Sequence, residues 1–132
     1  MLFAALTLAA TVAAAAPASA PAQGQGIRRF ALISGASKGG AGRTPLRYAA
    51  TDARAMQHVL TELGGITEAN TILVLDADRA RLRAGFERLR QLVTAAAAPG
   101  SRTEIVFYYS GHSDEQGLLL GNERVSYAEI RA

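Results

Sequence analysis

The sequence predicts an α/β fold in which a parallel sheet is flanked by helices. Three short apolar segments, residues 29–34, 71–75 and 103–110, have the length and composition of buried strands. Between them, residues 51–63 and 78–97 carry apolar side chains every three or four positions, as amphipathic helices do. Strands that alternate with helices are typical of a parallel sheet covered on both faces. The 132 residues suffice for one small domain.

The N-terminal segment predicts export from the cytoplasm. Residues 1–20 carry no charged side chain, and Ala18 and Ala20 fit a signal-peptidase cleavage site. We expect a signal peptide over residues 1–20, a linker over 21–26 and the domain itself over 27–132, in a secreted or periplasmic protein. The apolar run of about 15 residues is shorter than the ~20 that a membrane span needs. An alanine-rich leader of another kind, or a wrongly assigned start, is the alternative.

A glycine-rich loop follows the first strand. Residues 34–43, Ser-Gly-Ala-Ser-Lys-Gly-Gly-Ala-Gly-Arg, resemble the phosphate-binding turn of short-chain dehydrogenases, in which glycines let backbone N–H groups approach a pyrophosphate. However, Gly42 stands one residue later than in that turn, and Thr44-Pro45 interrupts the helix that should follow. We therefore favour a flexible loop, with an NAD(P)-binding domain as an alternative.

Both predicted helices have an apolar face and defined ends. Gly64-Gly65 ends the first helix, and Asp78 is in position to cap the N-terminus of the second. The first apolar face consists of Ala53, Met56, Val59, Leu60 and Leu63. The second consists of Leu82, Phe86, Leu89 and Val93.

After the third strand we expect a short extended piece, a turn and the start of a helix. Residues 117–120 are apolar and precede a turn at Gly121-Asn122. Ser126 and Glu129 have the spacing of a capping box, in which each side chain accepts a hydrogen bond from the backbone N–H of the other. The sequence stops at Ala132, and a helix of one turn is not stable alone. We therefore expect the front part of a longer protein, with a frayed terminus as the alternative.

The composition excludes several kinds of site. The chain has no cysteine, which excludes disulfides, thiolate zinc sites and a thiol nucleophile within it. All 14 basic residues except Lys38 are arginines, and they are spread along the chain, whereas nucleic-acid binding favours a clustered basic stripe. Asp114 and Glu115 are expected to form a solvated turn, although orientation of a histidine or metal binding is the alternative. We expect no nucleic acid, metal or cofactor as a ligand.

Ligands of parallel sheets bind beyond the carboxyl ends of the strands. Here those ends lead into residues 35–37, into Asp76 and into residues 110–112. His112 is the candidate for chemistry, because imidazole changes protonation near neutral pH and acts as a general base. His58 lies in the middle of a predicted helix, and we assign it no role.

Three segments of the sequence together resemble one known family. Residues 107–112 (FYYSGH) take an apolar strand into Ser-Gly-His, and residues 46–53 (LRYAATDA) have the pattern L-x-x-A-x-x-D-A. Residues 114–121 (DEQGLLLG) have the pattern D-x-x-G-x-x-L-x-G. In this order and spacing they resemble the caspase and metacaspase-like cysteine peptidases (peptidase C14 type). The resemblance extends from about Ile27 to Ala132.

The resemblance implies a fold and a site. The fold would be the caspase-like three-layer α/β fold, a parallel sheet flanked by helices, truncated after the third strand and a short hairpin. His112 would be the general base of a His/Cys dyad, and the backbone N–H of Ser113, where the family has glycine, would donate to the oxyanion. The nucleophilic cysteine would follow the histidine by roughly 50 residues, outside this sequence. We therefore expect a caspase-like endopeptidase of peptides or proteins that is inactive as this fragment.

The resemblance implies two further expectations, and two alternative functions stand beside it. Related enzymes use a basic group from the loop that contains Arg47, so this side chain is a candidate to meet an acidic substrate residue. The third strand would normally pair with the strand that bears the cysteine, so residues 107–109 on an open edge predict aggregation or low stability. A non-catalytic caspase-fold module for binding or signalling is one alternative, which Ser113 keeps open. A dinucleotide-binding oxidoreductase is the other.

Overall fold

The computed structural model describes residues 26–131, so the predicted signal peptide over residues 1–20 lies outside the described residues. The elements in chain order are β1 (Ile27–Gly35), α1 (Ala49–Glu62), a 3-10 turn (Glu68–Asn70), β2 (Thr71–Leu75), α2 (Arg79–Ala96), β3 (Arg102–Ser110), β4 (His112–Asp114), β5 (Gly117–Leu120), β6 (Glu123–Ser126) and α3 (Tyr127–Arg131). This order confirms the predicted α/β fold. None of the described helices combines the length and the apolar character needed to cross a bilayer.

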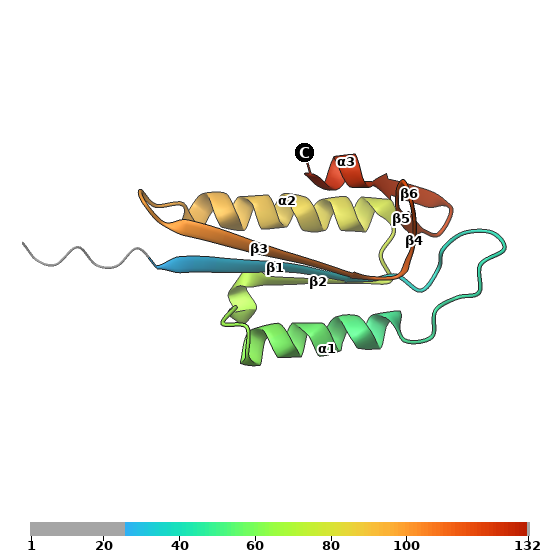
Figure 1. Cartoon of the computed structure of the whole chain (residues 1–132), viewed down its shortest axis with the longest axis horizontal. Helices are drawn as coiled ribbons and strands as arrows, with labels where there is room; N and C mark the ends of the chain where they lie inside the picture. Colours follow the sequence, from blue (N-terminus) through green and yellow to red (C-terminus); the bar gives the residue numbers. More distant parts are fainter. Residues whose placement is uncertain (1–25, 132) are drawn as a thin grey trace, which may run out of the picture.

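The main sheet consists of three parallel strands in the order β2-β1-β3. The central strand β1 pairs with β2 along five residues and with β3 along nine. α1 covers one face of this sheet and α2 covers the other (Figure 1). A chain that first moves to one side of β1 and then to the other through right-handed crossovers must place its two helices on opposite faces. The strand order therefore accounts for the three layers.

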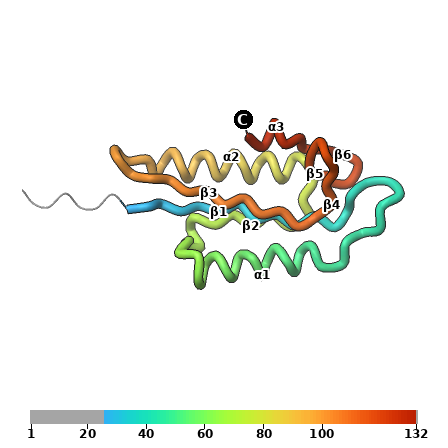
Figure 2. The backbone as a smooth tube through the Cα atoms, in the orientation of Figure 1, coloured from blue at the N-terminus to red at the C-terminus, as the bar shows by residue number. Residues whose placement is uncertain are grey.

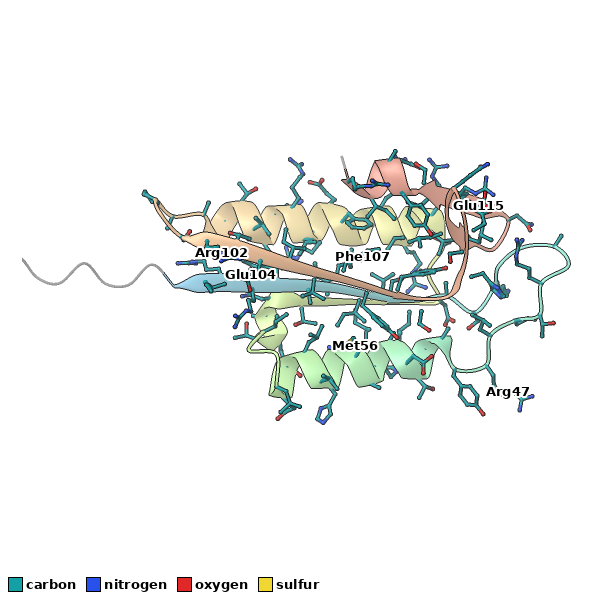
Figure 3. All side chains as sticks on the ribbon, viewed as in Figure 1. Arg47, Met56, Arg102, Glu104, Phe107 and Glu115 are labelled. Carbon is teal, nitrogen blue, oxygen red and sulfur yellow. The ribbon has the colours of Figure 1, made fainter. Side chains whose placement is uncertain are left out.

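Two apolar cores lie on the two faces of the sheet. On the α2 side, Leu32 of β1 packs with Leu82 in one cluster, to which Phe107 of β3 adds. On the α1 side, Ile33 packs with a second cluster that includes Met56 of α1. Figure 3 shows Met56 and Phe107 in these two separate layers. Since successive strand residues face opposite sides, the unbroken apolar run of the central strand supplies both cores.

A small antiparallel sheet, β4-β5-β6, lies beyond the carboxyl ends of the parallel strands on the α2 side (Figure 2). β5 is buried throughout, and its Leu118 and Leu120 join the core beside α2. α3 follows β6 and begins with the predicted capping box. The Glu129 backbone N–H donates to the Ser126 hydroxyl at 3.1 Å, and the Ser126 backbone N–H donates to the Glu129 carboxylate at 3.0 Å. The capping box is thus confirmed.

The prediction was accurate for α2 and partly wrong for α1. The Asp78 carboxylate accepts the backbone N–H of Arg81 at 2.7 Å, which confirms the predicted N-cap of α2. In α1, however, Val59 and Leu63 are 47% and 83% exposed rather than part of the apolar face. Leu63 stands after the end of the helix, and Val59 lies about 90° around the helix from the residues that contact the sheet. Only the part of the apolar face that a strand can reach is buried.

Candidate active site

The candidate site lies where the strand order reverses. After β1 the chain moves outward to β2, and after α2 it returns to the opposite side of β1, so the connections that leave β1 and β3 diverge. Ligands of open α/β sheets bind in the crevice at such a switch point. Here the two strand ends are tied together, because the Ala36 backbone N–H donates to the Ser110 carbonyl oxygen at 2.9 Å. His112 begins β4 directly after this junction.

His112 is held by the loop that follows β1. Its Nε2 lies 3.1 Å from the Thr44 carbonyl oxygen, and the side chain is half-buried. A carbonyl oxygen only accepts hydrogen bonds, so the proton of the neutral imidazole is on Nε2 and Nδ1 carries the free lone pair. Gly39 lies so close to the ring that a Cβ at this position would overlap it. The loop thereby fixes the tautomer that leaves Nδ1 available as a base.

The glycine-rich loop supports His112 and does not open into a helix. A dinucleotide-binding turn leads directly into a helix N-terminus, whereas residues 36–48 separate β1 from α1. The loop is instead tied down by two backbone hydrogen bonds. The Leu46 N–H donates to the Ser37 carbonyl oxygen, and the Gly121 N–H donates to the Lys38 carbonyl oxygen, both at 2.8 Å. Among the described residues, this loop therefore lacks the geometry of a pyrophosphate site.

The backbone N–H of Ser113 faces away from the neighbouring strand. In the β4–β5 pair, His112 is opposite Leu119, Ser113 is opposite Leu118 and Asp114 is opposite Gly117. The last pair is closed by a two-residue connection and is therefore a hydrogen-bonded pair. Bonded and non-bonded pairs alternate in antiparallel ladders, so His112–Leu119 is bonded and Ser113–Leu118 is not.

Serine is compatible with the backbone conformation at this position. Among the described residues, Asp76 is the only non-glycine residue with a positive φ, so Ser113 lies in the region that L-residues ordinarily adopt. A serine at this position therefore brings no backbone strain. The role of Ser113 as an oxyanion donor stays a prediction.

A carboxylate that sequence reasoning gave no role lies beside this junction. The Ser110 hydroxyl donates to Asp52 Oδ2 at 3.1 Å, which joins the end of β3 to the first turn of α1. The only sequence signal that could have indicated this contact was Asp52 itself, the acidic residue of the segment 46–53. Arg47, the predicted contact for an acidic substrate group, is exposed at the end of the loop before α1 and points away from the body of the molecule (Figure 3).

Asp114 and Glu115 form a turn, as predicted. The Asp114 Oδ1 accepts the backbone N–H groups of Gln116 at 2.9 Å and Gly117 at 3.2 Å, and its Oδ2 pairs with Arg124. These donors, the Gln116 N–H first, lower the pKa of Asp114 below its ordinary value. Glu115 is exposed at the tip of this turn (Figure 3). The described residues contain no group of three or more acidic or histidine side chains that could hold a metal ion.

Comparison with protein-family models gives a match that covers most of the described residues. A family model described as the caspase domain (peptidase C14) matches residues 28–129. The matched region includes all the strands of both sheets except the first residue of β1. A search of curated proteins found no match.

Proposed function

The chain belongs to the caspase-domain family, and from this premise we propose that it supplies His112 as the general base of a cysteine-type endopeptidase. The observation that carries the proposal is the 3.1 Å contact of Nε2 with the Thr44 carbonyl oxygen, which in the neutral imidazole makes Nδ1 the proton acceptor at the switch point of the sheet. The chain itself contains no cysteine, so the thiol has to come from outside these 132 residues.

The proposed reaction is acyl transfer to a thiol. His112 Nδ1 takes the proton of the thiol, and the thiolate sulfur attacks the carbonyl carbon of the scissile peptide bond. The carbonyl oxygen becomes an oxyanion, which accepts a hydrogen bond from the Ser113 backbone N–H. The protonated imidazole then gives its proton to the leaving amine nitrogen as the C–N bond breaks. Water hydrolyses the thioester that remains and restores the thiol.

The substrates in this proposal are peptides or proteins. Export through a signal peptide over residues 1–20 is part of the same proposal, and the sequence supports it with an uncharged, alanine-rich segment that ends in small residues. N-terminal sequencing of the protein recovered outside the cytoplasm tests it. We expect a mature N-terminus at Pro21, and retention of Met1 would contradict export by cleavage.

The catalytic proposal is tested by peptide hydrolysis. The product of the complete reading frame is assayed beside its His112→Gln variant, with His58→Gln as the matched control because His58 is exposed on α1. We expect no hydrolysis by the 132-residue chain. In the complete product, thiol-dependent hydrolysis should fall about 10²- to 10⁴-fold in His112→Gln and stay unchanged in His58→Gln. Hydrolysis by the 132-residue chain that thiol reagents do not affect would overturn the proposal.

A non-catalytic binding module is the second candidate. Ser113, which stands where the family has glycine, keeps this candidate open. The complete reading frame separates the two candidates, since a cysteine that ends a further apolar strand supports the peptidase. If the complete product has no such cysteine and still binds peptides equally well with His112→Gln, the binding module is the function.

A further inference from the structure

Tyr109 connects the end of β3 to the strand that carries His112. It is the penultimate residue of β3, and its side chain packs on the α2 side of the sheet. Its hydroxyl lies 2.8 Å from the Leu119 carbonyl oxygen and 3.2 Å from the His112 carbonyl oxygen. Leu119 and His112 are opposite each other in the β4–β5 pair, so one hydroxyl contacts both strands of the pair.

The hydroxyl is a permanent donor. Burial raises the pKa of Tyr109 to about 12, and the neighbouring Tyr127 adds to the rise. The phenol is therefore protonated throughout the neutral range, and the two carbonyl oxygens in reach accept its single proton. Both contacts of the hydroxyl are partly buried, where a hydrogen bond is electrostatically stronger than at the surface.

Gly111 makes this contact possible. A Cβ at Gly111 would overlap the hydroxyl end of the Tyr109 ring, so the phenol occupies the space that a side chain would fill. Gly111 is not among the glycines with positive φ. The glycine between β3 and β4 is thus required for the space it leaves and not for a left-handed backbone conformation.

The His112 carbonyl and the Ser113 N–H belong to one peptide unit. That unit is planar and trans, so its C=O and N–H bonds point in opposite directions. The Tyr109 hydroxyl and the pairing with Leu119 hold the carbonyl on the β5 side. The Ser113 N–H is consequently directed to the open side of β4, which is an edge strand among the described residues.

We propose that Tyr109 is a positioning residue, whose hydroxyl orients the His112–Ser113 peptide and so aims the Ser113 N–H. Tyr109 acts through this peptide and does not touch the reacting atoms. The value of the orientation for catalysis rests on the proposed function, in which Ser113 donates to the oxyanion. The orientation itself is a property of the 132-residue chain and is measurable without activity.

The test compares Tyr109→Phe with Tyr108→Phe by backbone amide NMR on the 132-residue chain. Tyr108 is the matched control, because it neighbours Tyr109 in β3 but packs on the α1 side. In Tyr109→Phe we expect the Ser113 and Leu119 amide signals to shift and the Ser113 order parameter to fall from about 0.85 towards 0.6. Tyr108→Phe should leave both amides as in the wild type. A Ser113 amide that is equally ordered in Tyr109→Phe and in the wild type would overturn the proposal.

A second measurement needs no variant and decides the case if Tyr109→Phe does not fold. In the wild type, the Tyr109 hydroxyl proton should exchange slowly with water and show a nuclear Overhauser contact to the β4–β5 backbone. A rapidly exchanging hydroxyl proton contradicts the proposal. In a peptidase-active product, Tyr109→Phe should lower kcat by up to about 100-fold with little change in KM. Loss of Ser113 order in a protein without peptidase activity would refute the proposed function and leave the positioning role standing.

Discussion

At the scale of single residues, the candidate site depends on close approaches between backbone and side chain. Gly39 has no side chain and so leaves room for the His112 ring, and Gly111 leaves room for the Tyr109 ring in the same way. The Thr44 carbonyl oxygen then selects the imidazole tautomer. None of these partners is a charged side chain, so the imidazole is positioned by shape and by neutral hydrogen bonds.

Gly39→Ala tests how tightly the loop holds the imidazole. The added methyl group overlaps the His112 ring, so either the ring or the loop has to move. We expect the free energy of unfolding to fall by about 1–3 kcal/mol, as for overpacked sites, and the His112 Nε2 signal to shift in NMR spectra. Gly26→Ala is the control, since a Cβ there has no neighbour within 4 Å. Equal effects of the two substitutions would show that Gly39 has no specific role.

Asp114 gives the β4–β5 turn a dependence on pH. Its pKa is lowered in the folded state, so it stabilises the fold above the unfolded-state pKa of about 4 and loses this contribution as the pH falls through the folded-state value. Asp114→Asn should therefore reduce the loss of stability between pH 6 and pH 3, measured by urea unfolding. Glu115→Gln, on the same turn, should leave that loss unchanged. An unchanged loss in Asp114→Asn would contradict this assignment.

At the scale of secondary-structure elements, the residues that begin or end an element predicted the structure as well as apolar periodicity did. The bounds of β2 coincide with the predicted segment 71–75, and α2 begins directly after its predicted cap. In α1, Val59 and Leu63 were wrongly predicted to be buried, because periodicity does not reveal how much of an apolar face the neighbouring sheet covers. α3 has only five residues, and contacts beyond its own turn hold it, including the ion pair of Arg79 with Glu129 at 2.7 Å.

Asp78→Ala measures the cap of α2. The substitution removes the acceptor for the Arg81 backbone N–H and should lower the free energy of unfolding by about 1 kcal/mol, within the range 0.5–2. Arg88→Ala, an exposed position in the same helix, should change it by less than about 0.5 kcal/mol. Chemical denaturation of the three proteins provides the comparison. A loss in Arg88→Ala as large as that in Asp78→Ala would rule out a specific capping effect.

At the scale of the whole molecule, the order β2-β1-β3 leaves β3 at an edge of the sheet in the described part of the chain. β3 is nine residues long and rich in β-branched and aromatic side chains, and its Ile105 is 54% exposed. A long, apolar edge strand is a template for pairing with another chain. The predicted tendency to aggregate therefore has a defined structural origin.

Ile105→Lys tests this origin. A charged side chain on the edge should reduce concentration-dependent association of the 132-residue chain, measured by sedimentation velocity. Leu63→Lys is the matched control, because Leu63 is 83% exposed but stands after α1 and not on a strand. We expect Leu63→Lys to associate like the wild type. A wild-type chain that stays monomeric at all concentrations would contradict the prediction.

The sequence by itself determined those features that depend on neighbouring residues along the chain. It was sufficient for the three parallel strands, the two long helices, the Asp78 cap and the capping box at Ser126, because each follows from periodicity or from a contact within four residues. The motifs around His112 are also local in sequence. They indicated the family that the match over residues 28–129 establishes.

The tertiary structure alone decided what depends on residues far apart in the sequence. These features are the strand order, the pairing of β4 with β5, the contact of His112 with Thr44 and the approach of Gly39 to the imidazole. Thr44 and His112 are 68 positions apart, and no periodicity encodes a meeting over that separation. The histidine proposed as the base was therefore visible in the sequence, whereas its contact with Thr44 and the direction of the Ser113 N–H follow only from how the loop and the hairpin pack at the end of the sheet.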